Sequence, residues 1–115
     1  MLAKDIRTFV PSKDYEESKK FYTALGFQIT FQSEEICLME MGACSFFLQN
    51  YYNEEFASNL MLQLIVSSIE YAFKTITSLE ELNIKFKPIK EESWGKVIYL
   101  WGPAGELWHI TELNS

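Results

Sequence analysis

Apolar residues recur every three or four positions in two stretches, residues 15–25 and 69–79, and this spacing predicts two amphipathic helices. Asp14 precedes the first stretch and Glu17 follows three residues later, a pattern typical of a helix start because both carboxylates can accept backbone N–H groups. Gly26 offers the left-handed conformation that ends a helix. We therefore expect the first helix to begin at about Tyr15 and to end near Leu25.

The second stretch has a similar start. Ser67 and Ser68 precede Ile69, and Glu70 lies in the first turn. When Asp14 is laid on Ser68, a shift of 54 residues, the apolar faces of the two helices coincide. The chain thus contains a repeat close to half its own length.

Around each helix the apolar period changes from near 3.6 to 2, which predicts strands. Ile6, Thr8 and Val10 form one before the first helix, and the alternation continues at 27–31, 36–38, 46–48, 60–66, 84–86, 97–101 and 107–113. Turns are expected at Gly42-Ala43 and at residues 102–105, and residues 50–59 read as a polar, aromatic connector. Each half then reads strand, helix and three strands.

Length and composition narrow the class of protein. The 115 residues fit one domain, and 48% hydrophobic residues supply enough material for a core. Sixteen acidic against ten basic side chains give a charge of -6, the wrong sign for a nucleic-acid partner. No apolar run is long enough to span a membrane and no secretory segment is visible, so we expect a cytoplasmic protein with Cys37 and Cys44 reduced.

Two groups of motifs resemble a known family. Residues 9–27 contain an Asp, a Ser four residues later, Phe-Tyr and Leu-Gly-Phe, and residues 94–110 contain Trp-Gly-Lys, Gly-Pro-Ala-Gly and Trp-His-Ile. The first group resembles the vicinal oxygen chelate superfamily of glyoxalases, bleomycin resistance proteins and dioxygenases, and the second resembles its bleomycin resistance branch. The resemblance implies an α+β fold of two βαβββ modules, about 1–52 and 58–115, that form a curved mixed sheet around a cleft in one domain, 1–115. It also implies a homodimer that shares its clefts.

The resemblance also identifies where metal ligands would lie. These positions fall on Arg7, Gln49, Met61 and His109. A guanidinium is a fixed cation and a thioether is soft, so neither suits a hard divalent ion. We therefore expect no metal, no cofactor and no catalytic residue. His109 is the single histidine of the chain, and it stays open whether it is a hydrogen-bonded structural residue or a ligand contact.

Strand alternation and the family pattern together predict the lining of the cleft. In the last strand His109 shares a face with Leu107, while Trp108 lies on the opposite face, which packs in the core. Trp94 precedes the seventh strand of the repeat, where the resemblance assigns a Trp that stacks on a planar ligand. The predicted ligand-binding residues are Arg7, Phe9, Phe47, Gln49, Met61, Gln63, Trp94, Tyr99, Trp101 and His109.

The lining is aromatic and neutral-polar with one cation, which favours a flat organic ligand over an ion. Our hypothesis is a noncatalytic, metal-free protein of the bleomycin resistance type that sequesters a planar small molecule, with a cationic one favoured by the acidic charge. The alternative is a metal-dependent glyoxalase-like lyase or dioxygenase with a displaced metal site. A third hypothesis is a partner-regulating domain whose cleft is filled by its own aromatic side chains.

Overall fold

The first half of the chain forms a four-stranded sheet, which we call sheet A. The computed structural model describes residues 1–82 and 84–115. Sheet A has the order β1-β4-β3-β2, in which β1 runs parallel to β4 and the other neighbours are antiparallel. Helix α1 (Tyr15–Leu25) packs on β4. The strands of sheet A are β1 (Phe9–Pro11), β2 (Gln28–Gln32), β3 (Ile36–Met41) and β4 (Cys44–Gln49).

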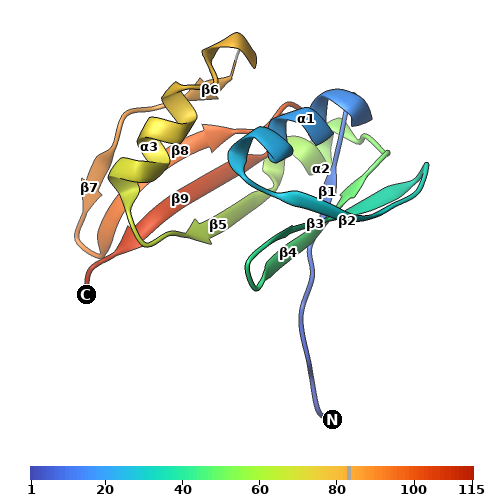
Figure 1. Cartoon of the computed structure of the whole chain (residues 1–115), viewed down its shortest axis with the longest axis horizontal. Helices are drawn as coiled ribbons and strands as arrows, with labels where there is room; N and C mark the ends of the chain where they lie inside the picture. The colour runs from blue at the N-terminus through green and yellow to red at the C-terminus, as the bar shows by residue number, and fades with distance from the viewer. Residues whose placement is uncertain (83) are drawn as a thin grey trace.

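The second half repeats this arrangement in sheet B. Its order is β5-β9-β8-β6, with β7 also paired to β8, and β5 runs parallel to β9. Helix α3 (Ile69–Thr77) packs on β8 and β9, and the short helix η1 (Glu80–Leu82) follows it (Figure 1). The strands are β5 (Met61–Ile65), β6 (Lys85–Phe86), β7 (Lys90–Glu92), β8 (Gly95–Trp101) and β9 (Leu107–Leu113). The predicted α+β fold with a repeated module is confirmed.

The two helix starts form as their sequences predict. Asp14 Oδ1 accepts a hydrogen bond from Glu17 N at 3.1 Å, and Ser68 Oγ accepts one from Tyr71 N at 3.2 Å. Gly26 ends α1 with a φ of 121°, a left-handed conformation that side chains other than glycine rarely adopt. The equivalent caps at Asp14 and Ser68 support the repeat at the level of backbone geometry.

Several predicted boundaries were wrong. β1 begins only at Phe9, because the chain before residue 7 runs away from the body of the molecule and Ile6 is 92% exposed (Figure 1), although the Thr8 carbonyl still accepts from Phe47 N at 3.0 Å. The connector at 50–59 contains the helix α2 (Glu54–Asn59), whose start is capped by Asn53 Oδ1. β7 lies where a loop was expected, since pairing with β8 fixes a strand that has no apolar alternation of its own. Ile84 precedes β6 and does not belong to it.

One hydrophobic core joins the two modules on the helix-covered sides of both sheets. Tyr22 of α1 lies at its centre, with its ring 4.9 Å from that of Phe46 in β4 and 5.7 Å from that of Trp108 in β9. Val10 and Leu48 from sheet A and Ile98, Leu100 and Ile110 from sheet B belong to the same buried cluster. Trp108 therefore packs in the core as predicted.

A buried polar cluster that the sequence analysis did not predict lies within this core. Tyr22 donates to Glu106 Oε2 at 2.7 Å, and Trp108 Nε1 donates to the hydroxyl of Tyr22 at 2.8 Å. Glu106 Oε1 accepts from Ala104 N at 3.0 Å. Burial raises the pKa of the Glu106 carboxyl, and burial together with that carboxyl raises the pKa of the Tyr22 phenol. These bonds tie α1 of the first module to β9 of the second.

The described helices are all too short or too polar to cross a membrane. In each sheet one face packs against a helix, α1 in sheet A and α3 in sheet B, and the opposite face is free of that helix within the described residues. These free faces carry most of the predicted ligand-binding residues, and we call them face A and face B after their sheets.

Candidate functional site

Face A presents a row of apolar side chains across all four strands. The register pairs Phe9 with Phe47, Phe47 with Leu38, and Leu38 with Phe31. The rings of Phe9 and Phe47 lie 5.1 Å apart, and Phe9 is 45% exposed. Phe31 was missed by sequence reasoning because a register shift between Ile29 and Phe31 changes which residues of β2 share a face, whereas Leu38 joins the row through the regular pairing of β3 with β4.

The two polar residues predicted on face A flank this row. The Arg7 guanidinium carbon lies 5.5 Å from the centre of the Phe47 ring, and Arg7 Nε is 3.4 Å from Asp5 Oδ2. Gln49 lies at the far end of β4, two residues beyond Phe47 and therefore on the same face. Face A thus combines an aromatic row with one cation and one amide.

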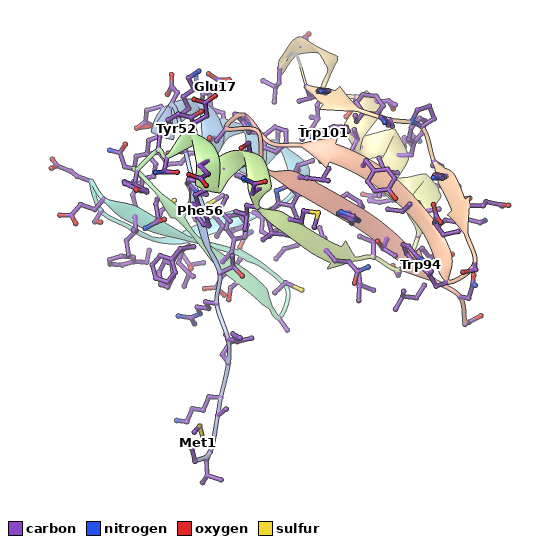
Figure 2. The ribbon with its side chains drawn as sticks, turned by 180° about the vertical axis from the view of Figure 1, so that it is seen from behind. Met1, Glu17, Tyr52, Phe56, Trp94 and Trp101 are labelled. Atoms are coloured by element: carbon purple, nitrogen blue, oxygen red, sulfur yellow. The ribbon has the colours of Figure 1, made fainter. Side chains whose placement is uncertain are left out.

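Face B carries the predicted aromatic residues of the second module. Tyr99 pairs with His109, which pairs with Gln63, so that these three side chains cross the sheet in one row. Trp101 and Met61 flank Leu107 in the next row. Figure 2 views the sheet from the side opposite α3, with Trp101 and Trp94 labelled along it. Face B is a partly exposed surface of rings, aliphatic side chains and amides.

Trp101 already has cations against its ring. Lys85 Nζ lies 4.6 Å and Lys87 Nζ 5.9 Å from the ring centroid. Both lysines are exposed and come from the region of β6, which pairs with β8. Their placement could not be read from the sequence, because a two-residue strand has too few positions to show alternation. The indole of Trp101 therefore has an electron-rich face available to a cation.

His109 has a free ring nitrogen. Its Nε2 atom is buried and has no hydrogen-bond partner within residues 1–82 and 84–115, while its ring meets that of Tyr99 edge-on at 5.0 Å. Nearby, Thr111 Oγ1 donates to the carbonyl of His109 at 3.1 Å, and Gln63 Nε2 donates to Thr111 Oγ1 at 3.4 Å. The structure therefore gives Nε2 no structural hydrogen bond, and a buried imidazole nitrogen without a partner is unusual.

Trp94 lies in the turn between β7 and β8. It is 42% exposed, and its carbonyl accepts from Asn114 N at 3.1 Å, so the turn is fixed to the end of β9. A Cβ on Gly95 would collide with the carbonyl oxygen of Glu112, which explains the glycine beside Trp94. Trp94 and Trp101 lie at opposite ends of β8 (Figure 2). The expected exposure of Trp94 is found, and its contact with a ligand stays a prediction.

The predicted site residues are divided between two sheets. Arg7, Phe9, Phe47 and Gln49 belong to face A, and Met61, Gln63, Tyr99, Trp101 and His109 belong to face B, with Trp94 at its end. The sequence predicted that these residues line one cleft and left open whether the two modules that form it belong to one chain or to two. Within a single chain each group forms part of its own face.

The side chains of these faces are poor ligands for a hard divalent ion. The family ligand positions hold a guanidinium, an amide, a thioether and one imidazole. Within residues 1–82 and 84–115, no three His, Cys, Asp or Glu side chains are grouped so that they could hold a metal ion. The same residues offer flat apolar surfaces, two amides and a cation, which suit an organic molecule.

A duplicated βαβββ domain with one free face on each sheet is the class of protein that these observations define. The sequence model of the glyoxalase/bleomycin resistance protein/dioxygenase superfamily matches residues 6–110, and the chain belongs to that superfamily. No curated protein sequence matches the chain.

Solved structures share the fold at low sequence identity. A bleomycin-binding protein complexed with bleomycin has 18% identity and a TM-score of 0.80 over 97% of this chain and 100% of its own. The bleomycin resistance determinant encoded on transposon Tn5 has 18% identity and a TM-score of 0.82 over 98% and 100%. The fosfomycin resistance protein FosX from Listeria monocytogenes, complexed with Mn(II) and sulfate, has 12% identity and a TM-score of 0.79 over 99% and 93%. Similarity at this level shows the fold alone.

Proposed function

We propose that this protein is a noncatalytic, metal-free binding protein of the bleomycin resistance type, which sequesters a planar small molecule. The observation that carries the proposal is the chemistry of the two free faces: they present aromatic rings, and the family's metal-ligand positions among them hold Arg7, Gln49, Met61 and His109. Phe9, Met61 and Trp94 are 45%, 65% and 42% exposed, so their own chain does not cover them. A flat ligand gains free energy by stacking on such rings and by displacing water from them.

A second copy of the chain supplies the other wall of the cleft. Face A of one copy set against face B of its partner brings the two groups of predicted residues together, and two-fold symmetry then creates two equivalent clefts. The exposed apolar side chains support this arrangement, because Phe31 on face A and Ile65 on face B are 52% and 56% exposed. We therefore propose a homodimer.

The ligand is proposed to be planar and cationic. The net charge of -6 attracts a cation over a long range, and Trp94 and Trp101 offer ring faces for short-range cation–π contact. Arg7 on face A suits an electron-rich or anionic group of the same ligand. To make that contact, Arg7 must break its ion pair with Asp5.

Tryptophan fluorescence tests the proposal, because Trp94 and Trp101 lie on face B while Trp108 is buried. Titration with bleomycin or with a planar acridine-type cation is expected to quench the emission at micromolar concentration. The double variant Trp94→Phe and Trp101→Phe retains Trp108 and is expected to lose the quenching. If neither probe quenches the wild-type protein at micromolar concentration, the sequestering function is wrong.

Sedimentation tests the shared cleft. The wild-type protein is expected to be a dimer at micromolar concentration, and Phe9→Asp on face A is expected to give monomers with weakened ligand binding. Tyr51→Asp is the matched control, since Tyr51 is 54% exposed but lies outside both sheets. A wild-type monomer that binds the ligand would contradict the shared cleft and leave the binding function intact.

Metal analysis distinguishes this proposal from a metal-dependent lyase or dioxygenase. Protein purified without chelator is expected to contain no stoichiometric Ni, Zn, Fe or Mn. A stoichiometric ion whose binding is lost in His109→Ala would establish the enzyme alternative, because His109 offers an unpartnered imidazole nitrogen.

A further inference from the structure

A pocket of about 500 Å³ lies at the junction of the two modules, and none of the predicted ligand-binding residues lines it. We call it the seam pocket. The end of α1 and the β3–β4 hairpin form one wall, and β5 with α3 forms the other. Its lining includes Leu25, Met41 and Cys44 from the first module and Val66, Ala72 and Ile76 from the second.

The seam pocket is open at the surface and closed at its base by the hydrophobic core. Ile76 and Ile110, which line it, are only 2% and 3% exposed and belong to the core cluster. Ile110 points to the helix side of sheet B, whereas its neighbour His109 belongs to face B. The base of the seam pocket at Ile110 therefore lies on the helix side of sheet B, opposite His109, and Ile65 at the end of β5 is a lining residue on the side of face B.

Among the residues that the structure describes, no charged side chain lines the seam pocket, although 23% of the chain is charged. Several of its polar groups are already engaged: Ser68 Oγ accepts from Tyr71 N at 3.2 Å, and Thr75 Oγ1 donates to the carbonyl of Tyr71 at 3.1 Å. Such a lining offers apolar contact and few free hydrogen-bonding groups. It disfavours any ligand that carries a charge, because that charge would lose its hydration without gaining a partner.

We propose that the seam pocket is a second small-molecule site, which takes a small, uncharged and mainly apolar ligand. Its volume lies within the range of about 300–1,000 Å³ that is usual for ligand pockets. The ligand class differs from the planar cation proposed for the free faces, because the lining differs: aliphatic and sulfur-containing side chains predominate, and Tyr71 contributes a ring.

The exposed segment of residues 1–8 is a less suitable occupant. Its apolar residues Leu2 and Ile6 are 99% and 92% exposed, but Lys4, Asp5 and Arg7 lie between or beside them. Burial of this segment in an uncharged pocket would strip water from those charges. A compact neutral molecule fills the same volume without that cost.

The uncharged fluorescent probe N-phenyl-1-naphthylamine tests the site directly. Its emission is expected to rise on binding to the full-length protein with a micromolar dissociation constant. Ala72→Phe fills the pocket from α3, and Cys44→Phe fills it from an exposed strand position where a large side chain does not disturb the core. Each variant is expected to weaken probe binding about tenfold or more, the equivalent of about 1.4 kcal/mol.

Trp101→Phe is the matched control on face B, and it is expected to leave binding of the probe unchanged. Conversely, Ala72→Phe is expected to leave quenching by the planar cation unchanged, so the two proposals can fail separately. If the probe binds equally well to Ala72→Phe and Cys44→Phe, or does not bind to the wild-type protein, the seam site is wrong.

Thiol alkylation locates the probe independently. Cys44 is exposed and lines the pocket, whereas Cys37 is buried, so iodoacetamide is expected to modify Cys44 first and more slowly when the probe is bound. An unchanged rate in the presence of bound probe would overturn the assignment. The full-length variant Leu2→Ser with Ile6→Ser tests the other occupant: tighter probe binding in that variant would assign the pocket to residues 1–8 and contradict our proposal.

Discussion

The same residue types have opposite environments in two regions of this molecule. At the junction of the modules, Tyr22 and Trp108 are 0% and 4% exposed and share a hydrogen bond. On face B, Tyr99 and Trp101 are half-buried and their rings stay partly open to solvent. Strand alternation assigns Trp108 and Trp101 to opposite sides of sheet B, and only one side has a helix to cover it. Aromatic residues alone therefore do not identify a binding face; their register against the helix does.

The two regions also differ in how their polar atoms are satisfied. At the junction, Glu106, Tyr22 and Trp108 bond to one another across the modules. On face B, the buried Nε2 of His109 has no partner. A satisfied buried cluster fixes one arrangement of the chain, whereas the buried Nε2 atom is left without the hydrogen bond that would offset its burial.

The largest expected effect is on the free energy of unfolding, when Trp108 in the core is replaced and compared with Trp101 on face B. Trp108→Ala removes a buried ring and is expected to lower the free energy of unfolding by about 3–5 kcal/mol. Trp101→Ala is expected to change it by about 1 kcal/mol or less, because the ring is already partly solvated. Urea unfolding measures both. Equal losses in the two variants would show that face B is covered in solution.

A smaller change in the free energy of unfolding is expected when the hydroxyl groups of Tyr22 and Tyr99 are removed. Tyr22→Phe leaves Glu106 Oε2 and Trp108 Nε1 without the partner they share, and an unsatisfied buried group costs about 1–3 kcal/mol. Tyr99→Phe is the control on face B, with an expected change of about 0.5 kcal/mol or less. If Tyr22→Phe unfolds at the same urea concentration as the wild-type protein, the buried cluster does not stabilise the junction.

The sequence predicted the elements whose signals are local. Helix α1 was predicted with both ends, and the capping patterns at Asp14 and Ser68 formed as expected. β7 was missed because its three polar residues become a strand only through pairing with β8. Glu106 was not singled out, since its partner Tyr22 is 84 residues away in the chain. Long-range pairing of polar atoms leaves no periodic trace in a sequence.

The sequence predicted only part of the candidate site, again because local patterns can be recognised in a sequence and long-range contacts cannot. Alternation correctly separated His109 from Trp108, because it needs only one reference residue per strand. It missed Phe31, which joins face A through an irregular register, and the lysines that lie against Trp101. The division of the predicted lining between two sheets depends on how the modules pack, which no local pattern encodes.

Substitutions on face B are also expected to change the affinity for the planar cation. Trp101→Ala is expected to weaken binding of the planar cation about tenfold, since stacking and cation–π contacts contribute about 1–2 kcal/mol. Lys85→Ala removes a cation that lies 4.6 Å from the same ring and is expected to strengthen that binding slightly, by about twofold. Fluorescence titration with Trp94 as the reporter measures both. A loss of affinity in Lys85→Ala would indicate an anionic ligand group at Trp101.

The smallest expected effect is a dependence of stability on pH at the junction. Burial raises the pKa of Glu106 above its ordinary value of 4.5, although bonds from Tyr22 and backbone N–H groups oppose part of that shift. The folded state therefore holds a proton at pH values where the unfolded chain has released it. Stability contributed by the protonated form is present below 4.5 and is lost as the pH rises through the raised pKa.

Glu106→Gln removes this titration and is expected to flatten the fall in unfolding free energy over the pH range just above 4.5. Its absolute stability also changes, because the amide adds a donor near the Tyr22 hydroxyl, so the slope against pH is the measurement that matters. Glu34→Gln, at an exposed loop position, is expected to keep the wild-type slope. If Glu106→Gln keeps the wild-type slope of unfolding free energy against pH, the Glu106 carboxyl is as well solvated in the folded protein as an exposed carboxyl. The contrast between the junction and the free faces would then not hold at Glu106.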